Sequence, residues 1–391
     1  LWRCHGVGPL TFYRIAQAYS SFNDFFNQPE LIWQRFGLKH KAIEQLKEWL
    51  SCPKKSFLQL GVDADLKWLE SDDRHHIIGI HHQSYPSLLK QIKDPPPFLF
   101  SMGNLSLLQR LQIGIVGSRQ ASSYGEKNAF HFARYLSDRG VCIVSGLAKG
   151  VDGQAHLGAL MGEGKTIGVI GHGLDSVYPK ENKPLFDRLK EEGLIVSEFP
   201  IGVQARPEYF PRRNRIISGM SVGVLVVQAS MKSGSLITAK EAMEQGREVF
   251  AIPGSIHDPT SKGCHQLIKE GAALVESVDD IWAQLPSFAS MESIEVQKIP
   301  AFFTLQALEH NTATLSTISP VEFDSQKEFT CSKEEITILQ CITKKINCID
   351  DLCVQTGWSV QHVTMLLTTL ELKDYILWDS LGYQIKNDIY Q

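Results

Sequence analysis

The sequence predicts an α/β protein, and two observations carry that prediction. Short apolar runs rich in Val and Ile alternate strictly with helical patterns between residues 111 and 285. Such runs are what strands covered on both faces require, and their alternation with helices indicates parallel strands joined by right-handed crossovers. We therefore expect a Rossmann-like, doubly wound, mostly parallel sheet.

The strands of this sheet are expected at the apolar runs, and the helices fall between them. The strand segments are residues 113–116, 141–145, 166–170, 194–197, 223–227, 249–252 and 273–275. The helical segments are residues 124–137, 152–161, 183–192, 214–219, 236–245 and 266–269. Residues 77–80 are a candidate edge strand.

The segments on either side of the sheet predict further domains around a core at residues 71–285. Residues 1–70 carry short helical patterns and predict a small helical domain, SAM-like or helix-hairpin-helix-like. Gly6-Val7-Gly8-Pro9 resembles the hairpin of a helix-hairpin-helix module, which grips a DNA backbone. The alternative is a helical adaptor without DNA contact. Residues 286–330 lose periodicity and predict a linker. Residues 331–391 combine three helical patterns with a hairpin, which predicts a winged-helix domain.

The recognition helix expected in the winged-helix domain, residues 360–370, has no Arg or Lys. Because cations supply most of the affinity for duplex phosphates, we do not expect this helix to read duplex DNA. A protein contact and a vestigial role both stay open.

Length and charge bound the function. A chain of 391 residues predicts two or three domains. With 39 basic and 43 acidic residues, no global field attracts nucleic acid, so any such surface must be local. No apolar run approaches the roughly 18 residues of a membrane span, and no secretory signal is evident, so a cytoplasmic protein without membrane contact is expected. The scattered cysteines favour reduced thiols over zinc.

The most informative stretch is Leu111–Arg119, a strand that breaks at Gly117-Ser118-Arg119 before a helix capped at Ser122 or Ser123. Ligands of doubly wound sheets bind beyond the carboxyl ends of the strands. Backbone N–H groups at a helix start, with a guanidinium beside them, suit a phosphate. The alternative is an ordinary turn with a surface arginine.

Three other strand ends carry related features. Lys149 lies between glycines before a helix, Gly171 and Gly173 follow the third strand, and Ser233-Gly234-Ser235 precedes another helix. Glycines let a backbone approach a ligand closely. We expect these turns to lie at the same edge of the sheet as Gly117-Ser118-Arg119.

The segment from Arg206 to Arg215 is the most specific, since it holds four Arg and one acidic residue in a net acidic chain. Pro211 suits the start of a helix, and Arg212 and Arg215 then share a face. Guanidiniums beside helix amides hold phosphate backbones. The alternative is a surface loop whose arginines pair with Glu198 or Glu208.

Several enzyme classes are disfavoured. No Gly-x-Gly-x-x-Gly follows a strand, and no Walker sequence occurs. Asp152 and His156 lie one helical turn apart, so a general-base pair is conceivable, but a capping Asp and a packed His are favoured. We expect no catalytic residue, no cofactor and no metal.

Together the motifs resemble the DprA/Smf family of DNA-processing proteins of bacterial natural transformation. The resemblance spans about residues 85–285 and rests on these segments: 117–119, 145–156, 171–182, 197–200, 210–215, 233–239, 246–247 and 253–272. It implies a core that binds single-stranded DNA without sequence preference, forms a homodimer and helps to load the recombinase RecA. Lys149 stands where the family commonly has Arg, Gln228 where it has Glu, and His265 where it has Asn.

The motifs and the resemblance together assign a set of DNA-binding residues: Gly117, Ser118, Arg119, Lys149, Gly171, Gly173, Arg212, Asn214, Arg215, Ser233, Gly234 and Ser235. Tyr178, Tyr209 and Phe210 are candidates to stack on bases. The alternative is a nucleotide-hydrolysing enzyme, because Ser233 to Glu241 is distantly similar to a phosphoribohydrolase loop.

Overall fold

The computed structural model describes residues 1–285, 333–343, 349–372, 375–379 and 382–385. The chain divides into two compact units, Leu1–Ile299 and Pro300–Gln391. The linker predicted at residues 286–330 lies outside the described residues. Within the described part, no helix is long and apolar enough to cross a membrane.

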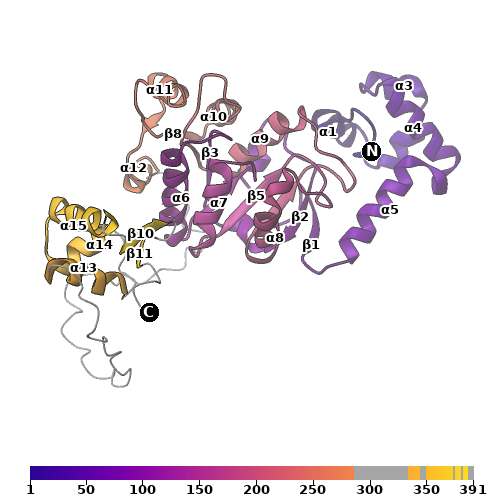
Figure 1. Cartoon of the computed structure of the whole chain (residues 1–391). Helices are drawn as coiled ribbons and strands as arrows, with labels where there is room; N and C mark the ends of the chain where they lie inside the picture. Colours follow the sequence, from indigo (N-terminus) through magenta and orange to yellow (C-terminus); the bar gives the residue numbers. More distant parts are fainter. Residues whose placement is uncertain (286–332, 344–348, 373–374, 380–381, 386–391) are drawn as a thin grey trace. The chain divides into compact units, whose positions relative to one another are not determined.

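The first unit contains a nine-stranded sheet in the order β1-β2-β6-β5-β4-β3-β7-β8-β9 (Figure 1). The strands from β6 to β9 are parallel, and β1 and β2 pair antiparallel at one edge. Their bounds are β1 (His75–Gly79), β2 (Phe98–Gly103), β3 (Gln112–Val116), β4 (Cys142–Ser145), β5 (Thr166–Ile170), β6 (Leu194–Ser197), β7 (Gly223–Val226), β8 (Glu248–Ala251) and β9 (Ala273–Leu274). The predicted doubly wound sheet and its edge strand are confirmed, while β2 was not predicted.

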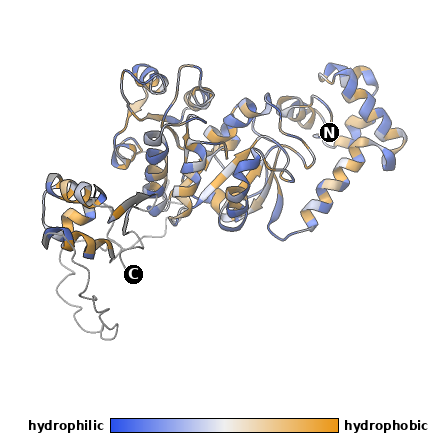
Figure 2. Cartoon of the chain, in the orientation of Figure 1, coloured by the Kyte–Doolittle hydropathy of each residue, from blue (hydrophilic) through white to orange (hydrophobic). Residues whose placement is uncertain are grey.

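Helices cover both faces of the sheet. Ile113 and Ile115 of β3 pack on one face, against α6 (Ser123–Asp138), α7 (Val151–Leu160) and α12 (Val278–Ala283). The other face carries α9 (Tyr209–Met220), α10 (Ser235–Glu244) and α11 (Lys262–Lys269). Near the β2 edge, α8 (Lys183–Glu192) covers β2, β5 and β6. Figure 2 shows the apolar strands between helices whose outer surfaces are hydrophilic.

Strand order fixes where a ligand can bind. From β3 the chain adds β4, β5 and β6 on one side and then returns to place β7 on the other side. The connections after β3 and β7 therefore leave the sheet in opposite directions. This is the topological switch point, beside which doubly wound sheets bind their ligands.

The helical segment before the sheet packs on the same unit. It contains α1 (Pro9–Ala18), α2 (Phe22–Phe26), α3 (Glu30–Arg35), α4 (His40–Ser51) and α5 (Phe57–Glu70). Arg3 pairs with Asp65 at 2.5 Å and donates to the Ile201 carbonyl at 2.9 Å. The Trp2 indole donates to the Glu198 carbonyl at 3.1 Å. These contacts attach the helices to the loop after β6.

Residues 1–285 also contain short 3₁₀ helices, namely η1 (Pro53–Lys55), η2 (Leu89–Gln91), η3 (Leu105–Gln109) and η4 (Lys180–Asn182).

The second unit is the predicted winged helix. Its helices are α13 (Lys333–Thr343), α14 (Ile349–Thr356) and α15 (Val360–Leu372), followed by the antiparallel pair β10 (Ile376–Asp379) and β11 (Gly382–Ile385). Its core is formed by Ile338, Ile342, Leu352, Val363, Leu366, Leu367, Leu370 and Ile376. The α15 residues Thr364, Met365 and Thr368 are exposed.

The loop between β4 and α7 is held by His156. The Leu147 N–H donates to His156 Nε2 at 3.2 Å, and His156 Nδ1 lies 2.7 Å from Thr166 Oγ1, which itself donates to the Ile143 carbonyl. The ring is therefore neutral, with both nitrogens used, and burial lowers its pKa to about 3. Asp152 accepts from the Gly146 N–H at 3.1 Å. His156 is packed in the core, as favoured from the sequence, but Asp152 is not a helix cap: Gly150 occupies the N-cap of α7, and Asp152 bonds the preceding loop and lines the cavity described below.

A matched pair of glycines in α7 tests the packing of α6 on α7. A Cβ at Gly158 would overlap the Phe130 carbonyl of α6, whereas a Cβ at Gly153 would meet its nearest atom at 3.4 Å. We expect Gly158→Ala to lower the unfolding free energy by about 1–3 kcal/mol through overpacking. Gly153→Ala should raise it by about 0.5–1 kcal/mol. Urea unfolding followed by circular dichroism measures both; equal effects would contradict this packing.

His156 predicts a pH dependence of stability. Its folded pKa lies below its ordinary value, so protons bind the unfolded chain preferentially, and the stabilisation present above pH ~6.5 is lost as pH falls towards the folded pKa. We expect this residue to remove about 2–3 kcal/mol between pH ~6.5 and ~4. His156→Gln should flatten that part of the profile in urea titrations. Parallel profiles for both proteins would count against a neutral, buried imidazole.

Candidate nucleic-acid interface

A cavity of about 480 Å³ lies at the switch point, beyond the ends of β3 and β7. The turn after β3, the β4–α7 loop, the first turns of α9 and the segment before α10 line it. It brings together these predicted residues: Gly117, Ser118, Arg119, Asn214, Ser233, Gly234 and Ser235. Topology explains the convergence, since all four segments follow strand ends at one edge of the sheet.

The turn after β3 is clamped by Gln228. The Ser118 N–H donates to the Gln228 carbonyl at 2.7 Å, and the Ser122 N–H donates to its side-chain oxygen at 2.9 Å. A Cβ at Gly117 would lie 2.6 Å from the Val151 side chain, so only glycine fits without a shift. Ser122 caps α6 by accepting from the Gly125 N–H at 3.2 Å. The turn is therefore fixed in place.

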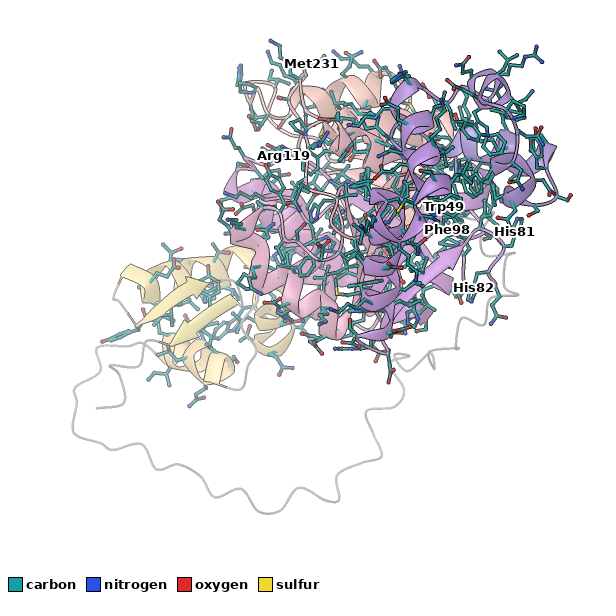
Figure 3. All side chains as sticks on the ribbon, turned by 90° about the vertical axis from the view of Figure 1, so that its right-hand side faces the viewer. Trp49, His81, His82, Phe98, Arg119 and Met231 are labelled. Carbon is teal, nitrogen blue, oxygen red and sulfur yellow. The ribbon has the colours of Figure 1, made fainter. Side chains whose placement is uncertain are left out.

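Arg119 projects from this clamped turn. Its guanidinium lies 5.5 Å from the centre of the Phe210 ring, which lies 5.4 Å from the Tyr178 ring at an interplanar angle of 31°. Within residues 1–285 no carboxylate forms an ion pair with Arg119. Figure 3 shows Arg119 on the side of the unit that carries Met231, away from His81 and His82. A guanidinium beside a ring that packs on a second ring offers groups for both a phosphate and a base.

The start of α10 forms another part of the cavity lining. Ser233 Oγ lies 2.6 Å from Ser235 Oγ and accepts from the Ser235 N–H at 3.3 Å. The Asn214 side chain donates to the Gly234 carbonyl at 3.4 Å and joins α9 to this wall. Helix amides and hydroxyls at this position suit an anion.

One face of α9 lines the cavity with Phe210, Arg213, Asn214 and Ile217, which are spaced as one face of a helix requires. Arg213 was not among the predicted residues. It is 4% exposed and donates to the carbonyls of Gly146, at 2.6 Å, and Val169, while its Nε has no hydrogen-bond partner in the described structure. Burial lowers its pKa to about 10. Its spacing of three residues from Phe210, which places the two on one face of a helix, is the sequence signal that could have identified it.

Arg212 and Arg215 share a face, as predicted, but that face turns towards Glu198 and not towards the cavity. Glu198 Oε2 accepts from Arg212 at 2.9 Å and from Arg215 at 2.6 Å. Arg215 is 5% exposed and also pairs with Asp94 at 3.3 Å. Pairing with Glu198 was the alternative considered for this segment. Because successive helical residues turn by 100°, Arg213 lies on a different face of α9 from Arg212, and it is Arg213 that lines the cavity.

Three further predicted residues lie outside the cavity lining. Lys149 is exposed and pairs with Glu181 at 2.9 Å. A Cβ at Gly171 would lie 3.4 Å from the Phe210 ring, and one at Gly173 would lie 2.7 Å from the Pro200 carbonyl. The two glycines allow close packing of the neighbouring loops, and neither of them lines the cavity.

Metal chemistry gains no support from the part of the chain that the structure describes. There, no group of three or more His, Cys, Asp or Glu side chains could hold a metal ion.

Two family models match the chain. The model for DNA recombination-mediator protein A matches residues 76–286, and the DprA winged helix domain matches residues 324–379. Protein Smf from Escherichia coli is 46% identical over 256 residues, which are 65% of this chain and 66% of that protein. The matched region is therefore slightly less than two thirds of that relative.

Two solved structures are similar. DNA processing protein A from Streptococcus pneumoniae is 39% identical, with a TM-score of 0.61 over 72% of this chain and 95% of that one. The same protein from Helicobacter pylori, described for its single-stranded DNA binding mode, is 30% identical, with a TM-score of 0.50 over 54% of this chain and 95% of that one. The chain belongs to the DNA recombination-mediator protein A family, also called DprA or Smf.

Proposed function

We propose that this protein binds single-stranded DNA without sequence preference in the switch-point cavity, and that it acts by binding and not by catalysis. One observation carries the proposal. The unpaired Arg119 guanidinium, the Ser233–Ser235 hydroxyls and amides, and the Phe210 ring converge on one cavity. The family relationship and the H. pylori relative's DNA binding support the same conclusion.

The two kinds of group would bind different parts of a strand. Arg119 and the helix amides neutralise a phosphate, whose release of counterions makes affinity fall with salt, with a slope of about −0.7 per phosphate on single strands. Phe210 and Tyr178 offer ring faces, and every base has a face to stack. Binding is then independent of sequence and favours single strands, because a duplex hides its base faces.

The role in the cell follows from the family resemblance. We propose that the protein shields incoming DNA and passes it to RecA during transformation and recombination, as a cytoplasmic homodimer. The winged helix would contribute a protein contact and not duplex binding, because α15 has no Lys or Arg and exposes Thr364, Met365 and Thr368.

Removing the Arg119 guanidinium should weaken binding of poly-dT by roughly 10- to 100-fold, the equivalent of one charged hydrogen bond. The salt slope should also become about 0.7 less steep. Fluorescence anisotropy of Arg119→Ala with a labelled oligonucleotide, repeated across a salt series, measures both quantities. Arg188→Ala is the matched control, since within residues 1–285 this exposed arginine of α8 forms an ion pair with its helical neighbour Glu192 and no other. Unchanged affinity in Arg119→Ala would remove the cavity from the binding site.

The phosphoribohydrolase alternative makes a different prediction. Its catalytic glutamate would correspond to Glu241, but Thr238 lines the cavity and Glu241 does not, while His156 is fully used in the core. We expect no adenine when the purified protein is incubated with AMP and the products are separated by chromatography. Adenine release that disappears in Glu241→Gln would favour the enzyme.

A further inference from the structure

A second row of rings and guanidiniums lies beside the cavity, on the neighbouring face of α9. The Tyr209 ring stacks on Phe199 at 4.4 Å, with Arg206 at 5.9 Å from its centre. The Arg212 guanidinium lies 5.2 Å from the Phe199 ring and 5.8 Å from the Trp2 ring. We call Arg206, Tyr209, Arg212 and Trp2 the α9 track, with Phe199 buried beneath it.

We propose that the α9 track is a second contact site for the DNA strand, binding nucleotides that extend beyond the cavity. This inference rests on the proposed function. It also gives the helical segment before the sheet a part in DNA binding, through Trp2.

Arg212 is held as a ready phosphate ligand. Glu198 is fully buried and fixes Arg212 Nη2 at 2.9 Å, and the rings of Trp2 and Phe199 confine the guanidinium plane. Still, 34% of the Arg212 side chain is exposed. A guanidinium has five N–H donors, so donors remain for a phosphate, and a side chain already fixed loses little entropy on binding.

Tyr209 and Arg206 complete the track with an accessible ring and an accessible charge. The Arg206 side chain is 62% exposed, and its nearest carboxylate, Glu208, is equally exposed at 3.9 Å. An exposed pair of this kind is weak, so a phosphate can replace Glu208. Tyr209 is partly exposed, and its ring is braced from behind by Phe199.

The track is continuous with the cavity. Tyr209 immediately precedes Phe210, which lines the cavity, so a strand leaving the Phe210 ring meets the Tyr209 ring next. From there Arg212 lies one turn along α9 and touches Trp2, whose indole is anchored on Glu198. Figure 1 shows α9 beside α1, at the side of the sheet where the helical segment packs. Alternating rings and cations match alternating bases and phosphates, and a duplex would offer only the phosphates.

Oligonucleotide length tests the track. Full-length protein is titrated with labelled oligo-dT of about 5 and about 20 nucleotides, the shorter matching the lower end of single-strand site sizes. We expect Arg206→Ala with Tyr209→Ala to weaken binding of the long oligonucleotide roughly 10-fold or more through lost stacking. The dependence of the long oligonucleotide's affinity on salt should become less steep by about 0.7, because one phosphate-binding cation is lost. The short oligonucleotide should bind as to wild type.

Two variants keep the test decisive. Arg206→Glu alone changes only an exposed side chain, so it should preserve the thermal melting temperature and still weaken binding of the long oligonucleotide. The Arg188→Ala control should bind oligonucleotides of both lengths as the wild type does. If the track variants bind the long oligonucleotide as the wild type does, or lose equal affinity for both lengths, the proposal that the α9 track contacts DNA is wrong. Unchanged binding of the short oligonucleotide by Arg119→Ala overturns the cavity instead, so the two failures are distinct.

Discussion

The constraint on which the site depends is the reversal of direction at β3. The chain fills one side of β3 before it returns to add β7 on the other side, and the connections after these two strands therefore diverge. Neither connection can cover the gap between them. The cavity is a consequence of topology, and the side chains only determine what it binds. That is why four segments spread over more than a hundred residues of sequence contribute to one site.

Glu198 gives α9 its orientation over this gap. A fully buried carboxylate is costly unless it is paired, and here two guanidiniums of α9 and the Trp2 indole, through the backbone carbonyl, gather on one residue. Removing one partner from a buried pair typically costs about 3–5 kcal/mol. Since Arg212 and Arg215 are drawn towards Glu198, the face with Phe210, Arg213 and Asn214 must turn towards the cavity. The buried Glu198 thus sets the rotation of α9 and anchors Trp2 of the helical segment, and in this way it positions both the cavity face and the α9 track.

The sequence was enough to predict the sheet and the turns at its edge, because strand periodicity and glycine-rich ends are local signals. Gly117, Arg119 and Ser233 were placed correctly at one edge for this reason. The rotation of α9 about its axis, which decides which of its residues face the cavity, could not be predicted from the local sequence. Arg212 and Arg213 are chemically identical neighbours, and their separation depends on Glu198, a contact across the fold. Likewise β2 follows a run of prolines and pairs with the distant β6, so its local pattern carried little information.

Affinity for an anionic strand by a chain of net charge −4 requires that cations be concentrated and carboxylates be neutralised where the strand passes. Two buried acidic side chains lie at the site: Asp152, which lines the cavity, and Glu198, which pairs with two guanidiniums. Asp152 is buried beside Arg213, which opposes the rise that burial causes in the pKa of Asp152. These two carboxylates are buried, while Arg119 and part of Arg212 are exposed; Glu208 is exposed but lies beside Arg206. Because screening by salt acts beyond about 8–10 Å, the remaining acidic surface has little effect on a strand lying on these two rows. A local site of this kind is what the proposed DNA binding requires in a protein whose overall charge would repel a strand.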